Sequence, residues 1–292
     1  MWPGFVMAAL GAVAFSGKAI IAKLAYRYGV DAVTLLMYRM LFSLPFFVLM
    51  AWWAGRGKPV LTQRQWVAVF GLGLSGYYLA SHLDFLGLQY ISASLERLIL
   101  YLNPTLVLML GWMLYGRRIG SRQALAMAVS YSGVLLVFGH EASFEGSATA
   151  IGGVLVFGAA LSYAVYLIFS GEFVNQLGSL RLVGLATTVA CVLCIAQFVL
   201  LRPMSAANVA PEVINLSLFN AVFCTVVPVL LVMMGIERIG AGLASQFGMI
   251  GPMSTLLMGA YFLDEPLNMW VGVGTVLVLL GVFWASKIKR VY

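Results

Sequence analysis

Seven ionisable residues interrupt the long apolar stretches of this 292-residue chain. A charge in the hydrocarbon core of a bilayer costs about 3 kcal/mol on insertion scales, so such residues usually face protein or water and mark functional sites. All of them lie before residue 100: Lys18, Lys23, Arg39, His82, Asp84, Glu96 and Arg97. Side chains of these types can bind an organic anion, carry a proton or pair with one another.

Ion pairing is the first interpretation of the two acids in this set. The helices before and after residue 90 are expected to form a tight hairpin, which puts Asp84 and Arg97 at a similar depth. Because an unpaired buried charge costs far more than a paired one, we expect Asp84 to pair with Arg97. Glu96 could in the same way meet Lys23 or Arg39.

The remaining cations and the proton carriers leave alternatives open. Two positive charges are in surplus once both acids are paired. Lys18 lies too deep to reach the headgroups easily by snorkelling. Snorkelling and binding of a substrate carboxylate are therefore equal alternatives for it. Proton-coupled transport would need Asp84, Glu96 or His82, whereas a simple salt bridge at Asp84 would favour facilitated diffusion.

Tyrosines recur at helical spacing beside these charges. A buried tyrosine hydroxyl needs a hydrogen-bond partner that lipid does not offer, so these helix faces are expected to point inward. Core packing is the alternative for any single tyrosine. Together with the apolar Met249, the tyrosines predict a cavity that suits stacking against a ring. The faces are Ser75, Tyr78 and His82; Arg97, Tyr101 and Pro104; and Tyr163, Tyr166 and Ser170.

One short motif suggests an enzyme. Residues 73–76 read Gly-Leu-Ser-Gly, like the G-x-S-G signature of intramembrane serine proteases. Such a serine needs a histidine within about 3 Å of its hydroxyl. His82 is seven residues further along the same helix, about 10 Å away, and His140 falls in a loop. We therefore expect close helix packing here and no enzyme, and the sequence has no metal-binding or nucleotide-binding motif that would imply a cofactor.

The composition indicates the elements that position these residues. Hydrophobic residues make up 62% of the chain, charged residues 9%, and the mean hydropathy is +0.99. Soluble domains carry roughly 25% charged residues, and about 20 apolar residues cross a bilayer as a helix. The sequence thus predicts an all-α membrane protein with the lipid bilayer as its surroundings and no nucleic-acid partner. Ten helices are expected, at residues 3–28, 31–54, 64–87, 92–115, 120–139, 148–171, 178–201, 213–235, 240–262 and 266–286.

The charged residues near the helix ends predict the orientation. Eleven lysines and arginines fall on one side of the ten helices and two, Arg27 and Arg202, on the other. Cytoplasmic loops carry the excess of basic residues, so both termini are expected in the cytoplasm and the chain in the cytoplasmic (inner) membrane. The sequence does not indicate an oligomeric state.

A shift of 148 positions aligns residues 87–120 with residues 235–268 without a gap. Seven of the 34 aligned positions are identical, among them the glycine pairs at 87/235 and 111/259. Pro104 aligns with Pro252, and each proline falls near the middle of its predicted helix. A proline there removes a backbone hydrogen bond and permits a bend, so we expect the two to act as equivalent hinges.

Two repeats of five helices follow from this alignment, residues 1–140 and residues 148–290. Because five is odd, the second repeat enters the membrane from the opposite side. Inverted repeats are typical of secondary transporters, whose substrate sites lie near the bilayer midplane between the halves. A channel is the rival interpretation, but the sequence has no repeated selectivity-filter loop or ring of like charges.

The chain resembles a known family in these features. Leu263-Asp264-Glu265-Pro266 after the ninth helix and the Gly-x-x-x-Ile-x-Ala-x-Leu start of helices 4 and 9 are similar to the EamA family of the drug/metabolite transporter superfamily. In detail the sequence is similar to its YddG-type exporters of aromatic amino acids. The resemblance covers almost the whole chain, although the first repeat has Arg117-Arg118 where the second has the acidic step. It implies helices 1–4 and 6–9 around a central cavity, with 5 and 10 outside.

The function expected from the residues and the resemblance is export of aromatic and other apolar amino acids or small metabolites by alternating access. Export of lipophilic cations is the main alternative substrate class. We expect Asp84 and Glu96 to serve coupling or ion pairing. The expected substrate-binding residues are Lys18, Tyr78, His82, Arg97, Tyr101, Tyr163, Tyr166 and Met249.

Overall fold

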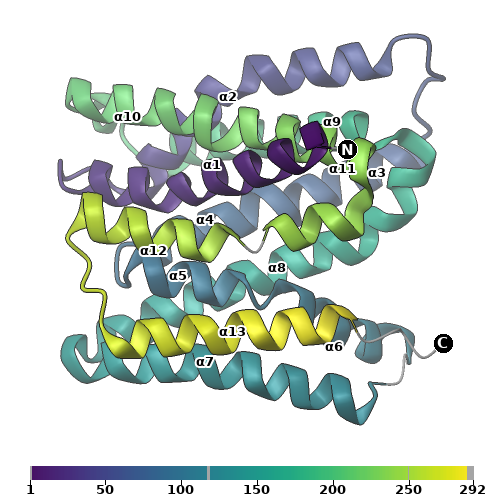
Figure 1. Cartoon of the computed structure of the whole chain (residues 1–292). Coiled ribbons are helices and arrows are strands. Elements are labelled where there is room, and N and C mark those ends of the chain that lie inside the picture. Colours follow the sequence, from purple (N-terminus) through teal and green to yellow (C-terminus); the bar gives the residue numbers. More distant parts are fainter. Residues whose placement is uncertain (1, 117–118, 249, 288–292) are drawn as a thin grey trace.

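The structure is a computed structural model and describes residues 2–116, 119–248 and 250–287 (Figure 1). Within these ranges the chain is helical, without a β-strand. Seven helices are long and apolar enough to span a membrane, which confirms the prediction of an all-helical membrane protein. They cover Trp2–Tyr26, Ala32–Gly55, Ala93–Tyr115, Ser121–Ser143, Ser147–Leu177, Ser179–Leu201 and Pro211–Gly235. Two shorter apolar helices, Ile250–Leu263 and Met269–Ala285, accompany them.

The helical elements follow the predicted apolar blocks closely. Those of the first half are α1 (Trp2–Tyr26), α2 (Ala32–Gly55), α3 (Gln63–Leu72), η1 (Gly73–Leu79), α4 (Ala80–Gly87), α5 (Ala93–Leu100), α6 (Asn103–Tyr115) and α7 (Ser121–Glu145). Those of the second half are α8 (Ser147–Leu177), α9 (Ser179–Leu201), η2 (Met204–Ala207), α10 (Pro211–Ala221), η3 (Val222–Val226), α11 (Val227–Gly248), α12 (Ile250–Leu263) and α13 (Met269–Lys287).

Polar side chains cap the first turns of several helices. The Asp31 carboxylate accepts hydrogen bonds from the backbone N–H groups of Val33 and Thr34 at the start of α2. Ser92 Oγ caps α5 by accepting from Leu95 N–H at 3.0 Å. Such caps satisfy N–H groups that have no partner within the helix. They fix the ends of the helices that carry the charged residues.

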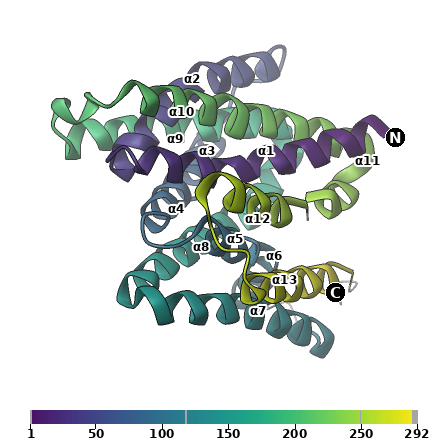
Figure 2. The ribbon, with the colours of Figure 1, turned by 60° about the vertical axis from the view of Figure 1, so that its left-hand side comes forward.

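The helices lie side by side in one bundle (Figures 1 and 2). The packing pairs are α1 with α11 and α12, α2 with α9, α4 with α8, and α7 with α13. The α7–α13 pair forms one edge of the bundle in Figure 1. The start of α1 and the last turn of α13 lie at the same end in both views. The charge distribution predicts this end to be cytoplasmic, and we call the opposite one the outer end.

Both halves contain a π-helical segment at the same relative position. The first is η1, residues 73–79, and the second is η3, residues 222–226. Adding 148 to the bounds of η1 gives 221–227, which encloses η3. In each, the following backbone N–H bonds five residues back: Ala80 to Ser75 and Val227 to Val222. A π-helical turn holds an extra residue and changes which side chains face a neighbouring helix.

Helix 4 of the prediction is interrupted before Pro104. α5 ends at Leu100, and Pro104 lies in the first turn of α6. Asn103 Nδ2 donates to Leu100 O at 2.6 Å and so satisfies the carbonyl that Pro104 cannot bond. In the first half the proline therefore follows a helix end. In the second half, residue 249 lies outside the described residues; α11 is described to Gly248, and Pro252 lies near the start of α12 as described from Ile250.

The prediction of a loop between residues 235 and 240 is wrong. α11 continues as a helix from Val227 to Gly248 and carries the chain around the end of the bundle where α1 begins (Figure 1). The residues at this point are Ile236-Glu237-Arg238-Ile239. They include no glycine or proline that would end a helix.

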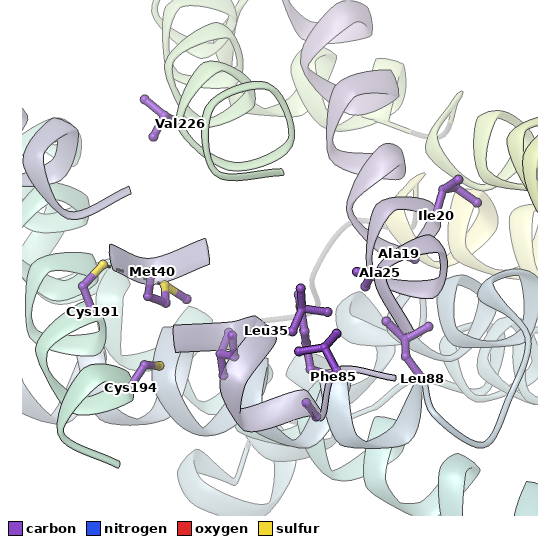
Figure 3. Close-up of a cluster of buried hydrophobic side chains, with 14 of the residues drawn as sticks. Ala19, Ile20, Ala25, Leu35, Met40, Phe85, Leu88, Cys191, Cys194 and Val226 are labelled. Carbon is purple, nitrogen blue, oxygen red and sulfur yellow. Dashed lines mark hydrogen bonds between the residues drawn. The ribbon is translucent and has the colours of Figure 1, made fainter. Parts of the chain in front are cut away.

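Small residues let the helices approach closely. A Cβ on Gly11 would lie 2.8 Å from Val232 Cγ2, and one on Gly73 would lie 2.5 Å from the carbonyl oxygen of Ala186. A buried apolar cluster joins α1, α2, α4, α9 and η3; Figure 3 places Ile20, Met40, Phe85, Cys194 and Val226 in it. Phe85 of this cluster follows Asp84 in the chain, and its ring lies under the Arg39 guanidinium.

Candidate functional site

A lysine between two carboxylates lies at the centre of the candidate site. Lys18 Nζ on α1 donates a hydrogen bond to Asp84 Oδ2 on α4 and lies 3.1 Å from Glu96 Oε1 on α5. The side chains are 14%, 4% and 0% exposed, respectively. The two carboxylates thus reach the same ammonium group from α4 and α5. We call Lys18, Asp84 and Glu96 the charged triad.

The expected pairing of Asp84 with Arg97 is wrong. Asp84 pairs with Lys18, and of the ion pairs formed between described residues none involves Arg97. Glu96 likewise meets Lys18 rather than Lys23 or Arg39. Similar depth is not enough for pairing, because Asp84 and Glu96 point toward α1. Lys18 is therefore a counter-ion of two acids.

Arg39 lies beside the triad on α2 and is held by other contacts. Its Nε donates to Thr225 Oγ1 of η3 at 3.0 Å, and its guanidinium lies over the Phe85 ring at 5.1 Å. The Thr225 hydroxyl in turn donates to Asn220 O at 3.0 Å. Arg39 is 5% exposed, and its Nη1 has no hydrogen-bond partner among the described residues.

Arg97 reaches the contact between α5, α1 and α12. Its Nη2 lies 3.4 Å from Ser16 Oγ, and a Cβ on Gly251 would lie 2.5 Å from the same Nη2. Ser16 Oγ donates to Gly251 O at 2.8 Å. Arg97 Nε is buried and has no partner among the described residues. This guanidinium thus lies where a helix of the first half meets one of the second half. Its Nε–H is still able to donate a hydrogen bond.

His82 and Tyr78 form a separate pair toward α9. Their rings stack with centroids 6.2 Å apart and an interplanar angle of 6°. Gln197 Nε2 lies 3.3 Å from both ring nitrogens of His82. The structure thus brings these two predicted residues together, as a contact of α4 and η1 with α9.

Tyrosines of α8 and η1 make an aromatic cluster that the sequence predicted only in part. Tyr163 and Tyr166 stack with centroids 5.4 Å apart, as their spacing indicates. Their partner is Tyr77, whose hydroxyl lies 3.2 Å from that of Tyr166 and whose ring meets Tyr166 edge to face. A Cβ on Gly76 would lie 2.4 Å from the Tyr166 ring, so glycine is needed for this approach. Tyr77 was missed because regular helical spacing does not hold through η1.

The remaining predicted residues lie apart from these clusters. Tyr101 is half-buried against the apolar side of α5, α7 and α8. Ser75 Oγ donates to Gly71 O at 2.9 Å, within its own helix. The glycines beside Ser75 serve close packing, as expected for the Gly-Leu-Ser-Gly stretch. Met249 lies outside the described residues.

A recess of about 590 Å³ opens at the outer end above the triad. It is lined by the ends of α1, α4, α5 and α7 and by the loop between α12 and α13, and Lys23, Arg27 and Glu141 contribute to it. Leu88 and Ser92, which also line it, are bonded through the backbone to Asp84 and Glu96, respectively. Each acid of the triad therefore lies one helical turn below the recess.

Glu265 closes one side of this recess. Its carboxylate accepts hydrogen bonds from Ala93 N–H at 2.7 Å, Ser94 N–H at 3.2 Å and Ser94 Oγ at 2.6 Å. Asp264, with φ of 58°, ends α12 in the left-handed conformation, and Glu265 N–H bonds back to Gly259 O at 3.1 Å. A Cβ on Gly259 would lie 2.8 Å from the Glu265 carboxylate, which explains this glycine. The acidic step after α12 thus caps the helix that carries Glu96 and Arg97.

Comparison with known proteins agrees with this architecture. Residues 2–139 and residues 150–287 each match the EamA-like transporter family. An uncharacterized transporter of Bacillus subtilis (strain 168), YcbK, is 31% identical over 98% of this chain and 94% of its own length. A second one, YyaM, is 26% identical over 91% of this chain and 84% of its own length.

Similarity extends to an archaeal protein and to a solved structure. An uncharacterized transporter of Archaeoglobus fulgidus is 23% identical over 95% of both chains. A protein of known crystal structure matches with a TM-score of 0.64 at 16% identity, over 97% of this chain and 96% of its own; that likeness shows the fold alone. The predictions of a membrane transporter and of a chain that is not an enzyme are confirmed. The chain belongs to the EamA-like transporter family of the drug/metabolite transporter superfamily.

Proposed function

We propose that this transporter exports aromatic and other apolar amino acids, and small metabolites like them, across the cytoplasmic membrane. It moves them by alternating access of two inverted five-helix repeats, residues 1–140 and residues 148–290. Both termini lie in the cytoplasm, where the basic loops are. The π-helical segments, which recur at the offset of the sequence repeat, support this arrangement.

The main support for this substrate class is that Arg97 lacks a partner for its charge among the described residues. It is an intramembrane cation without a carboxylate partner among the described residues, and its buried Nε has no acceptor. Its neighbours Ser16 and Gly251 come from the two halves, where the substrate sites of such transporters lie. A substrate carboxylate would supply the missing acceptor with a charge-assisted hydrogen bond. Lys18, the other candidate, is already engaged by two acids.

The aromatic cluster supports the preference for ring-shaped side chains. Tyr163 is half-buried and stacks on Tyr166, which Tyr77 supports from the edge. Aromatic pairs in offset or edge arrangements gain about 0.5–1.5 kcal/mol beyond their buried area. A substrate ring that joins this cluster would gain a contribution of that size.

Counterflow of labelled phenylalanine into liposomes that hold only this protein tests the role of Arg97. Replacement R97Q removes the charge and raises the KM for phenylalanine about ten- to hundredfold, since a hydrogen bond to a charged group contributes about 1.5–3 kcal/mol. R56Q is the matched control, because Arg56 is exposed and lies over Trp52. An R97Q protein with the KM of R56Q would overturn this assignment.

A further inference from the structure

The charged triad has more acceptors than donors. Lys18 Nζ contacts Asp84 and Glu96, yet Asp84 Oδ1 and both oxygens of Glu96 accept no well-aligned hydrogen bond from a described residue. Burial of a carboxylate is costly unless it is paired and hydrogen-bonded. Two carboxylates that share one site also repel each other. A single lysine therefore leaves the two acids with one negative charge and three oxygens unsatisfied.

The neighbouring polar groups do not supply the missing hydrogen bonds. Arg39 donates to Thr225 and lies over Phe85, and Arg97 is directed to Ser16, so the two guanidinium charges act on the acids only at longer range. Asn220 Nδ2 donates to the backbone oxygen of Lys18. Tyr26 Oη donates to Phe85 O at 2.7 Å. The other ionisable groups around the triad are the buried thiols Cys191, Cys194 and Cys224, which face Arg39.

The outer recess offers a short route for a proton. Leu88 and Ser92 line it, and they lie one helical turn from Asp84 and Glu96, respectively. Lys18 belongs to α1, whose contacts to Asn220 and, through Ser16, to Gly251 are with the second half. Lys18, Asp84 and Glu96 all belong to the first repeat, but α1 packs mainly on α11 whereas α4 packs mainly on α8. A movement of α1 relative to α4 and α5 would thus separate the lysine from the two acids.

We propose that Asp84 and Glu96 bind one exchangeable proton, with Lys18 as their counter-ion, and that this proton drives export. The inference rests on the proposed transport function and adds its energy source. The proton binds an oxygen of Glu96 and the new O–H donates to the Asp84 carboxylate, which makes the triad neutral. It enters from the outer recess, and the O–H bond breaks to release it to cytoplasmic water. Each proton that enters is exchanged for one substrate that leaves.

Infrared spectroscopy of the purified protein tests the proton site without any substrate. Wild type at neutral pH shows the absorption of a protonated carboxyl group, which disappears in E96Q and persists in E212Q. Glu212 is the matched control because it is an exposed acid in the first turn of α10. D84N is the second variant, and it shifts the absorption because the acceptor of the O–H bond changes. No protonated-carboxyl absorption in wild type from pH 6 to 8, roughly the range that brackets neutrality, would overturn the proposal.

Proteoliposomes then test coupling, with the membrane potential held at zero. An acidic lumen one pH unit below the bath drives substrate accumulation in wild type, up to about tenfold, because a one-for-one exchange equates the two concentration ratios. E96Q equilibrates the substrate but does not accumulate it, whereas E212Q behaves like wild type. Equal accumulation by E96Q and wild type would overturn coupling through Glu96. Failure of the proposed amino-acid function is distinguishable, since wild type would then lack counterflow but keep the infrared absorption.

Discussion

Glu265 Oε2 lies 2.6 Å from Ser94 Oγ and joins the loop after α12 to the first turn of α5. The two residues come from opposite halves of the chain and meet at the outer end, directly beside the recess. The same carboxylate accepts from two backbone N–H groups of α5. The contact therefore joins the two halves at one side of the recess and fixes the helix on which Glu96 and Arg97 lie.

The first prediction concerns the stability of this cap. E265A leaves the N–H groups of Ala93 and Ser94 without an acceptor and lowers the free energy of unfolding by about 1–3 kcal/mol. E265Q keeps an acceptor oxygen and loses less. Thermal unfolding in detergent measures both, with E212A as the control, since Glu212 is exposed on α10. Equal melting temperatures for E265A and E212A would show that the cap does not stabilise the protein.

Opposite gating effects are expected from the two prolines. Pro104 follows the end of α5, and Pro252 lies 148 residues further along the chain, in α12. Alanine at either position restores a backbone N–H donor and straightens the helix of that half. P104A and P252A therefore shift the balance of inward-open and outward-open states in opposite directions. The reporter is the cysteine of S16C in a protein whose native cysteines have been replaced. This cysteine is labelled from the outer side of the membrane. Identical changes in labelling for both variants would contradict the equivalence.

The orientation makes a separate prediction. Lys287 is the last residue of α13 and two further basic residues follow it in the sequence, so the carboxyl end is expected in the cytoplasm. Reporter enzymes active only in the cytoplasm or only outside it, fused after Tyr292, distinguish the two orientations. Activity of the external reporter alone would reverse the topology and remove the basis for the inverted repeat.

Tyrosine substitutions separate ring contact from structural packing. Y163A removes the half-buried ring that stacks on Tyr166, so transport of tryptophan falls about three- to tenfold while transport of threonine changes little. Y163F keeps the ring and most of the activity. Tyr261, which is 80% exposed, provides the control Y261A. Equal losses for both substrates in Y163A would mean that Tyr163 serves packing alone.

The sequence predicted the helices well because long apolar blocks leave few alternatives in a bilayer. The third expected span, residues 64–87, corresponds to α3, η1 and α4 without a break. The limits of α8 were set too short, since the helix continues to Leu177 beyond its apolar block. The loop predicted at residues 235–240 was wrong, because Ile236 to Ile239 include no glycine or proline and α11 continues through them.

The partners within the site could be predicted less well, because they depend on rotation and contact between helices. The intramembrane charges Lys18, Asp84 and Glu96 were identified from their cost in lipid, but their mutual pairing required the packing of α1 against α5. Tyr77 is brought to Tyr166 by a π-helical turn, which periodicity does not reveal. The cap formed by Glu265 depends on the left-handed conformation of Asp264.

Uptake of a panel of labelled solutes into liposomes that contain only this protein tests the central claim most directly. We expect flux of tryptophan, phenylalanine and other apolar amino acids, faster than that of small or acidic ones, with lower flux of every amino acid in R97Q and loss of the preference for rings in Y163A. A quaternary ammonium dye is the opposing substrate in the same panel. Robust flux of the dye with no amino-acid flux would contradict the claim and identify the protein as an exporter of lipophilic cations.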